Sequence, residues 1–270
     1  MEIPLYIVDA FASKLFSGNP AAVCPLEAWL DDELMQSIAA ENNLSETAFL
    51  VPVKESKNAW ELRWFTPSVE VDLCGHATLA SAVVLAMTNS ASDNSDPVFT
   101  FFTKSGELQV SKRGDWYYLD FPTRPLEELE QPEFIAKQIE AACTIKPVNV
   151  IRSSSNCLAE FENEEQIRNL QPDIARVKEL EFHGLIATAP GNNSDFVSRF
   201  FAPRVGINED PVTGSIHCSL IPYWHKITGK KEMLAYQVSA RGGELRCSLQ
   251  DERVLIGGQG VLFSQGTITL

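Results

Sequence analysis

The chain has 270 residues, 44% of them hydrophobic, which is enough to bury one large core or two cores of roughly 130 residues each. Its formal charge of -14 and its dispersed Lys and Arg residues exclude an extended nucleic-acid surface, because phosphate binding needs clustered positive charge. The start, MEIPLYIVDAF, does not resemble a signal peptide, and no uncharged apolar run approaches the roughly 18 residues of a membrane span. We therefore expect a soluble, cytoplasmic protein.

The cysteines and histidines limit the metal chemistry. Six cysteines are scattered without a Cys-x-x-Cys pair, which indicates buried reduced thiols in place of a disulfide framework or structural zinc. Of four histidines, only His217 and His225 lie close together, and their spacing of eight is not the i, i+4 pattern of a zinc helix. We expect no metal site.

In chain order, the first half alternates strands with two helices. Short segments rich in β-branched and aromatic residues predict strands at 6–11, 47–51, 61–66, 98–103, 108–112 and 116–121. DDELMQSIAAENN, residues 31–43, has the apolar spacing and acidic first turn of an amphipathic surface helix. ATLASAVVLAM, residues 77–87, is apolar on every side, so we expect a buried helix inside a curved or barrel-like sheet. The polar run Thr88–Pro97 predicts a loop.

The second half begins with FPTRPLEELEQPEF, residues 121–134, whose prolines and acidic run predict a connecting segment. A helix is expected over FIAKQIEAAC, residues 134–143. A second central helix is expected from Ser215 onward, where Pro222 should kink or stop it because proline has no backbone N–H.

Four motifs occur twice at nearly constant spacing, which indicates a duplicated domain. The matched positions are Arg63 and Arg199 (offset 136), Gly75 and Gly214 (139), Gly106 and Gly243 (137), and Asn19 and Asn156 (137). We predict an α+β fold of two such domains, at 1–118 and 119–262, with the C-terminal strand 263–270 packing on the first.

The candidate functional groups are two helix starts and two carboxylates. A helix start offers unpaired N–H groups to an anion, and Gly75 and Gly214 would allow a ligand to approach the backbone closely. Ser215 could donate a further hydrogen bond, although the same residues could simply begin helices. Glu46 precedes a strand and Asp210 precedes a proline, so each is either an acid–base group or an ordinary solvated or capping acid.

The glycine alignment bears on a thiol mechanism. It places Cys74 opposite Thr213, and a racemase with two opposed bases needs an ionisable group at both positions. Threonine cannot serve, so a two-thiol racemase is disfavoured. A thiol enzyme that uses Cys74 with His76 remains an alternative, although residues two apart at a helix start point in different directions.

Four stretches together resemble a known family. DAFASKLFSGNPAAVC, ENNLSETAFLV, RWFTPSVEVDLCGHATLA and EDPVTGSIHCSLIPYW are similar to the PhzF-like isomerases of phenazine biosynthesis, whose fold is like that of diaminopimelate epimerase and proline racemase. The resemblance runs from about residue 8 to the C-terminus. It implies two domains, each a mostly antiparallel, barrel-like sheet around a central helix, with the active site between them and no cofactor or metal.

The resemblance also implies roles for six residues. Glu46 would be the general acid–base group, with His76, Asp210 and Ser215 positioning it and the substrate and the backbone of Gly75 and Gly214 donating hydrogen bonds. These residues imply an isomerase that moves a proton on a small carboxylated, cyclic or unsaturated metabolite. The family's namesake isomerises a dihydro-hydroxyanthranilate, but that substrate does not transfer to this chain. The alternative is a non-catalytic protein that binds a small acid. A homodimer is compatible with the family, but no feature of this chain requires one.

Overall fold

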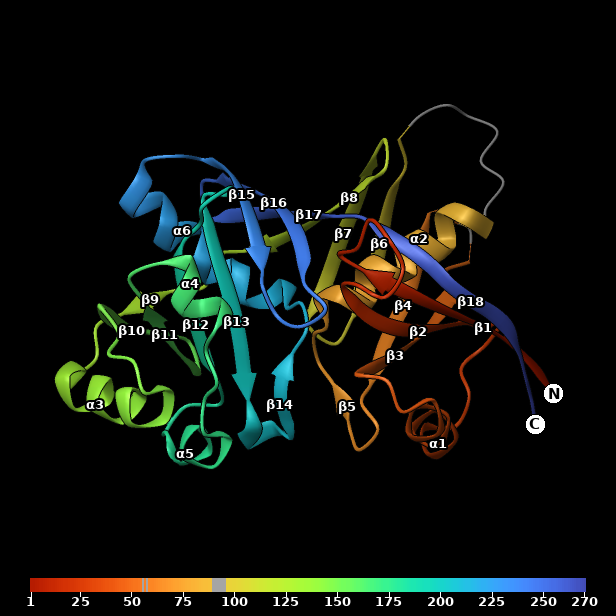
Figure 1. Ribbon diagram of the computed structural model, residues 1–270. Coiled ribbons are helices and arrows are strands. Elements are labelled where there is room, and N and C mark those ends of the chain that lie inside the picture. Colours follow the sequence, from red (N-terminus) through yellow and green to blue (C-terminus); the bar gives the residue numbers. More distant parts are fainter. Residues whose placement is uncertain (55, 57, 89–95) are drawn as a thin grey trace. The chain divides into compact units, whose positions relative to one another are not determined.

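The computed structural model describes residues 1–54, 56, 58–88 and 96–270 (Figure 1). The chain divides into two compact units. The first comprises Met1–Phe121 together with Ile256–Leu270, and the second comprises Pro122–Leu255. Most of the polar loop expected at Thr88–Pro97 lies outside the described residues.

The first unit is a mostly antiparallel sheet that packs against a central helix, α2 (Gly75–Thr88). Its strands are β1 (Glu2–Ala10), β2 (Asn19–Pro25), β3 (Glu46–Pro52), β4 (Ala59–Phe65), β5 (Glu70–Val71), β6 (Val98–Thr103), β7 (Gly106–Arg113), β8 (Trp116–Pro122) and β18 (Gly260–Thr269). Strands β2 and β3 pair in parallel, as do β4 and β6, and the other pairs of this unit are antiparallel. The C-terminal strand β18 pairs with β1, so the two chain ends lie side by side.

Helix α2 is buried from Gly75 to Leu85, as its uniformly apolar sequence predicts. It packs against β1, β2, β3 and β18. Its two hydroxyl side chains in this stretch stay hydrogen-bonded inside the core, because the hydroxyls of Thr78 and Ser81 donate to the carbonyl oxygens one turn earlier. The expectation of a buried central helix is confirmed.

Helix α1 (Asp32–Asn42) lies on the outside of the sheet of the first unit. It buries Met35, Ile38 and Ala39 in a cluster with Phe49 of β3 and Phe65 of β4, while its other face is exposed. The predicted amphipathic surface helix is therefore confirmed, and so are all six strands expected in the first half.

The second unit repeats this plan with α6 (His217–Thr228) in place of α2. Its strands are β9 (Leu126–Glu127), β10 (Asn149–Ser153), β11 (Asn156–Glu160), β12 (Leu185–Pro190), β13 (Phe196–Ala202), β14 (Ile207–Asp210), β15 (Glu232–Gln237) and β16 (Gly243–Gln250). Strand β17 (Arg253–Gly258) begins in the second unit and ends in the first. The remaining helices are α3 (Pro132–Cys143), α4 (Glu164–Arg168), α5 (Ile174–Glu179), and the 3-10 turns η1 (Pro203–Val205) and η2 (Gly214–Ile216). Parallel pairing occurs between β11 and β12 and between β13 and β15, as it does between β2 and β3 and between β4 and β6.

The repeated motifs occupy equivalent places in the two units. Asn19 and Asn156 open β2 and β11, Gly75 is the first residue of α2, and Gly214 opens η2 directly before α6. Arg63 on β4 forms a two-pronged ion pair with Glu70, through Nε at 2.7 Å and Nη2 at 2.9 Å. Arg199 on β13 pairs with Glu209 at the same two distances. These matches confirm the duplicated α+β arrangement that the sequence predicts.

Pro222 does not stop α6, which continues to Thr228. Proline removes one backbone N–H and therefore leaves the carbonyl oxygen of Cys218, four residues earlier, without its helical donor. The backbone N–H of Arg124, in the segment that leads into the second unit, donates to that oxygen at 3.0 Å. The connecting segment thus supplies the hydrogen bond that Pro222 cannot. Of the two outcomes expected at Pro222, a kink or a stop, the stop was wrong.

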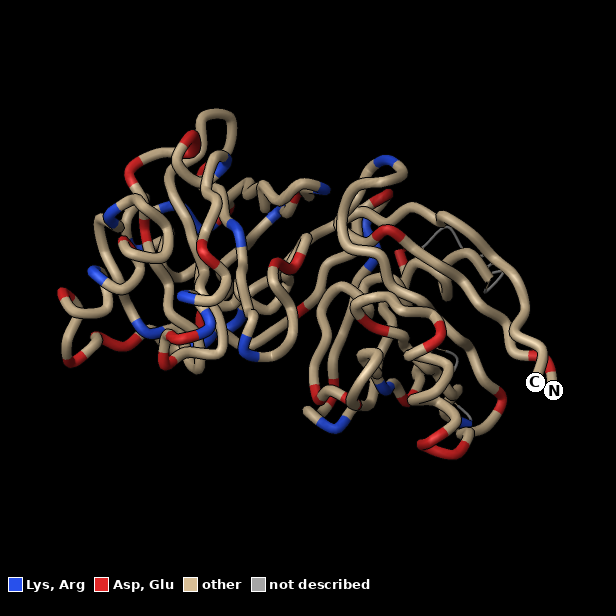
Figure 2. The backbone as a smooth tube through the Cα atoms, turned by 60° about the horizontal axis from the view of Figure 1, so that its bottom comes forward, with Lys and Arg blue, Asp and Glu red and all other residues tan. Residues whose placement is uncertain are grey.

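Charges of both signs are spread along the chain. Figure 2 shows the Lys and Arg positions scattered among the Asp and Glu positions in both units. Within the described residues, no helix is long and apolar enough to cross a membrane.

Candidate active site

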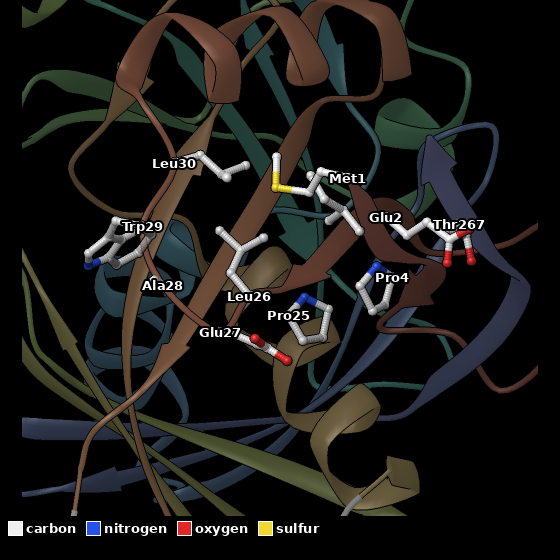
Figure 3. Close-up of a pocket in the computed structure, with 11 residues that line it drawn as sticks. Met1, Glu2, Pro4, Pro25, Leu26, Glu27, Ala28, Trp29, Leu30 and Thr267 are labelled. Atoms are coloured by element: carbon white, nitrogen blue, oxygen red, sulfur yellow. The ribbon is translucent and has the colours of Figure 1, made fainter. Parts of the chain in front are cut away.

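A cavity of about 700 Å³ opens on the first unit beside the N-terminus (Figure 3). Its lining is largely apolar, and its titratable side chains are Glu2 and Glu27. None of the residues predicted for the site lines this cavity. The candidate site lies elsewhere in the first unit, where β3 begins and α2 begins.

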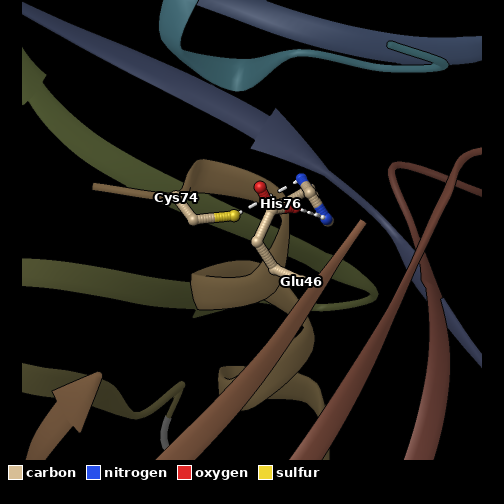
Figure 4. A group of neighbouring side chains, drawn as sticks. All are labelled: Glu46, Cys74 and His76. Atoms are coloured by element: carbon tan, nitrogen blue, oxygen red, sulfur yellow. Dashed lines mark hydrogen bonds and ion pairs between the residues drawn. The ribbon is translucent and has the colours of Figure 1, made fainter. Parts of the chain in front are cut away.

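Glu46, Cys74 and His76 come together at that point (Figure 4). Glu46 is the first residue of β3, and the parallel register with β2 sets it opposite Ala21. Cys74 precedes α2 and His76 is the second residue of that helix. The three residues are 9%, 6% and 5% exposed respectively, so water has little access to the group.

The imidazole of His76 contacts a different residue with each ring nitrogen. Its Nε2 lies 3.1 Å from Oε2 of Glu46, although the two groups lack the alignment of a hydrogen bond. Its Nδ1 lies 3.5 Å from Sγ of Cys74 and 3.2 Å from Nδ2 of Asn19. A proton can therefore be shared between the carboxylate and the imidazole without passing through bulk water.

The surroundings shift the pKa of His76 and of Cys74. Burial acts to lower the pKa of His76, but the contacts with Cys74 and Glu46 together outweigh it and hold that pKa well above its ordinary value. Burial raises the pKa of Cys74 to about 11, and the charge of Glu46 adds to the rise while His76 opposes it. Cys74 is therefore a protonated thiol at neutral pH, which disfavours the thiol-enzyme alternative.

The same three residues offer an oxygen, a sulfur and a nitrogen, a donor set that suits zinc. A metal ion bound by imidazole lies against one ring nitrogen, whereas here Nε2 faces Glu46 and Nδ1 faces Cys74. With the ring in this orientation, the contacts run from the carboxylate through the imidazole to the thiol.

The other predicted residues lie in the second unit, where β14 ends and α6 begins. Asp210 is buried, and its Oδ2 accepts a hydrogen bond from the Thr213 hydroxyl. Gln237 of β15 fixes the loop, because its side chain accepts from the Thr213 N–H at 2.8 Å and donates to the Asp210 carbonyl at 2.8 Å. Gly214 and Ser215 open η2, where Gly214 is buried and Ser215 is half-buried.

His217 occupies the place in the second unit that Thr78 occupies in the first. Its Nδ1 donates to the carbonyl oxygen of Thr213 at 2.9 Å, just as the Thr78 hydroxyl donates to that of Cys74 at 2.5 Å. Burial lowers the pKa of His217 to about 4, so the ring is neutral at physiological pH. The two histidines at the helix starts therefore have opposite protonation tendencies.

The structure brings Glu46 and His76 into contact, and it brings Asp210, Gly214 and Ser215 into one loop of the second unit. Sequence patterns indicated no chemical role for Asn19, which served only as a marker of the repeat, although its position at a strand start matched that of Asn156. Gln237 lacks any local signal, because it meets its partners from a strand more than 20 residues further along the chain.

Comparison with known proteins identifies the family. A family model described as phenazine biosynthesis-like protein matches residues 8–266. An uncharacterized isomerase from Pseudomonas aeruginosa is 50% identical over 270 residues, which covers 100% of both chains. The crystal structure of a PhzF family phenazine biosynthesis protein from Enterococcus faecalis is 46% identical, covers 100% of both chains and gives a TM-score of 0.93.

A more distant structure shares the fold. A hydroxyproline epimerase from Agrobacterium vitis is 10% identical, with a TM-score of 0.63 over 99% of this chain and 92% of its own. The recurrence of the fold at such low identity agrees with the epimerase-like architecture expected from the sequence. The chain belongs to the phenazine biosynthesis-like family, and within it to the isomerases.

Proposed function

We propose that the protein isomerises a small carboxylated, cyclic or unsaturated metabolite by moving a proton with Glu46 as general acid–base group, without a cofactor or metal. One observation supports this most strongly: the Glu46 carboxylate lies in a nearly dry site, 3.1 Å from the Nε2 atom of His76. General acid–base catalysis by such a group accelerates proton transfer by about 10²- to 10⁴-fold. The isomerases among its relatives support the reaction class.

In this proposal Glu46 exchanges a proton with a substrate carbon, and His76 orients the carboxylate and stabilises its charge. The backbone N–H groups at Gly75 begin α2 and are suited to a carboxylate or a developing enolate. Gly214 and Ser215 contribute the corresponding donors of the second unit, and Asp210 completes the catalytic set.

A single acid–base group fits the asymmetry between the two units. Where the first unit has Cys74 and His76, the aligned positions of the second unit have Thr213 and Ser215. Neither hydroxyl ionises usefully near neutral pH. A mechanism with a lone protonatable group therefore suits this chain better than one with two opposed bases.

The test is turnover in D₂O. The protein is incubated with a panel of small unsaturated and cyclic carboxylic acids, including a dihydro-hydroxyanthranilate, and each product is examined by NMR. We expect deuterium at one carbon of a substrate that is isomerised. Saturable binding without exchange at any carbon would instead support the non-catalytic acid-binding alternative, in which Ser215→Ala weakens binding.

A further inference from the structure

The side chain of Asn19 is in direct contact with the proposed acid–base pair. It is fully buried, and its Nδ2 lies 3.2 Å from Nδ1 of His76. Its Oδ1 faces the hydroxyl of Ser45 at 3.5 Å, and Ser45 immediately precedes Glu46. Asn19 thus links the start of β3 to the histidine that contacts Glu46.

The backbone holds Asn19 firmly in this position. It pairs with Ala10 in the antiparallel register of β1 and β2. The preceding Gly18 has a φ of +68°, and a Cβ there would lie 2.1 Å from the carbonyl oxygen of Ala10. Only glycine allows so close an approach, so the turn fixes the direction in which Asn19 enters the site.

Hydrogen-bond polarity then constrains the imidazole. An amide nitrogen only donates, and in the structure Nδ2 of Asn19 faces the imidazole while its Oδ1 accepts from the Ser45 hydroxyl. The thiol of Cys74, the second group at Nδ1, is also a donor when protonated. In the neutral ring, Nδ1 of His76 therefore faces two donors and should be the nitrogen that accepts.

We propose that Asn19 is a positioning residue that, whenever the His76 ring is neutral, keeps Nδ1 bare and so confines the single ring proton to Nε2, where it faces Glu46. Among the described residues, the titratable groups that face this imidazole are Glu46 and Cys74. The Glu46 carboxylate favours a second proton on the ring, and the Asn19 amide opposes it. The proton that serves the carboxylate is then always on the nitrogen that can reach it. This role rests on the proposed function, but its test does not require turnover.

The test is nitrogen NMR of His76 in the ¹⁵N-labelled full chain, from about pH 6 to pH 10. The four histidines are distinguished by comparison with His76→Gln. In the wild type, the neutral ring should show a bare Nδ1 and a protonated Nε2. A neutral ring with its proton on Nδ1 would overturn the proposal without the need for any variant.

A matched pair of variants tests the cause. Asn19→Asp replaces the donor with an acceptor, so the doubly protonated ring should persist to a pH about one to three units higher. Asn156→Asp makes the same charge change at the equivalent strand start, where the side chain is 6% exposed, and should leave the titration of His76 unchanged. An unchanged titration in Asn19→Asp would refute the role of the amide. Turnover that survives in Glu46→Gln would refute the proposed function and leave this result intact.

Discussion

Cys74 provides a quantitative test of the site's electrostatics, because the thiol should resist alkylation. Burial raises its pKa to about 11. At pH 8 such a thiol is about one part in a thousand ionised, against about a quarter for an ordinary cysteine, so ionisation alone should slow alkylation about 200-fold. The side chain's 6% exposure should slow it further.

The assay is iodoacetamide treatment of the native protein, followed by mass spectrometry of the peptide that contains Cys74. The same protein unfolded in urea is the reference, and there all six cysteines should react at ordinary rates. Glu46→Gln removes a charge that raises this pKa, so the variant should react faster than the wild type. Alkylation of native Cys74 at the unfolded rate, with loss of activity, would refute the reasoning and revive the thiol-enzyme alternative.

Three further predictions concern stability, measured by urea unfolding. The pKa of His217 falls from 6.5 to about 4 on folding. The free energy of unfolding should therefore decrease by about 3 kcal/mol as the pH falls from above 6.5 to 4. His217→Gln should abolish most of this decrease. Glu209→Gln should cost about 3 kcal/mol, because it removes the negative charge paired with the largely buried Arg199 and leaves that guanidinium only neutral carbonyl partners. Glu70→Gln should cost about 1 kcal/mol, because Arg63 is more exposed and keeps its ion pair with Asp32. Equal costs for the two variants would contradict this reasoning. Leu79→Ala should cost about 2–5 kcal/mol, since Leu79 is fully buried in α2.

Much of the fold follows from patterns that are local in the sequence. The apolar run over residues 77–87 predicts a buried helix because no face of it could remain in water. The repeated Arg-aromatic-Phe motif predicts the duplication, and in the structure each arginine binds an acid that follows it by 7 or 10 residues. Such contacts are visible in the sequence because both partners lie close together in the chain.

The continuation of α6 through Pro222 could not be predicted in this way. The rule for proline is correct about the lost hydrogen bond, but Arg124, which replaces it, lies almost 100 residues earlier. A local rule cannot detect a donor supplied by a distant segment, so the expected helix stop failed for a tertiary reason.

The candidate site was likewise predictable from the sequence only in part. Glu46 and His76 were selected by sequence motifs, and the structure shows that they touch. The roles of Asn19 and Gln237 depend on which atom faces which partner, and that is decided by strand register and by the direction of an amide group. Motifs indicate which residue types are present, whereas hydrogen-bond polarity needs coordinates.

The central claim is that the Glu46 carboxylate carries the transferred proton. The most direct measurement is the rate of deuterium incorporation into a turned-over substrate in D₂O, for Glu46→Gln and for a control, Glu27→Gln, in the cavity of Figure 3. The account predicts that Glu46→Gln keeps its fold and loses about 10²- to 10⁴-fold in rate, while the control matches the wild type. Undiminished incorporation by folded Glu46→Gln would contradict it.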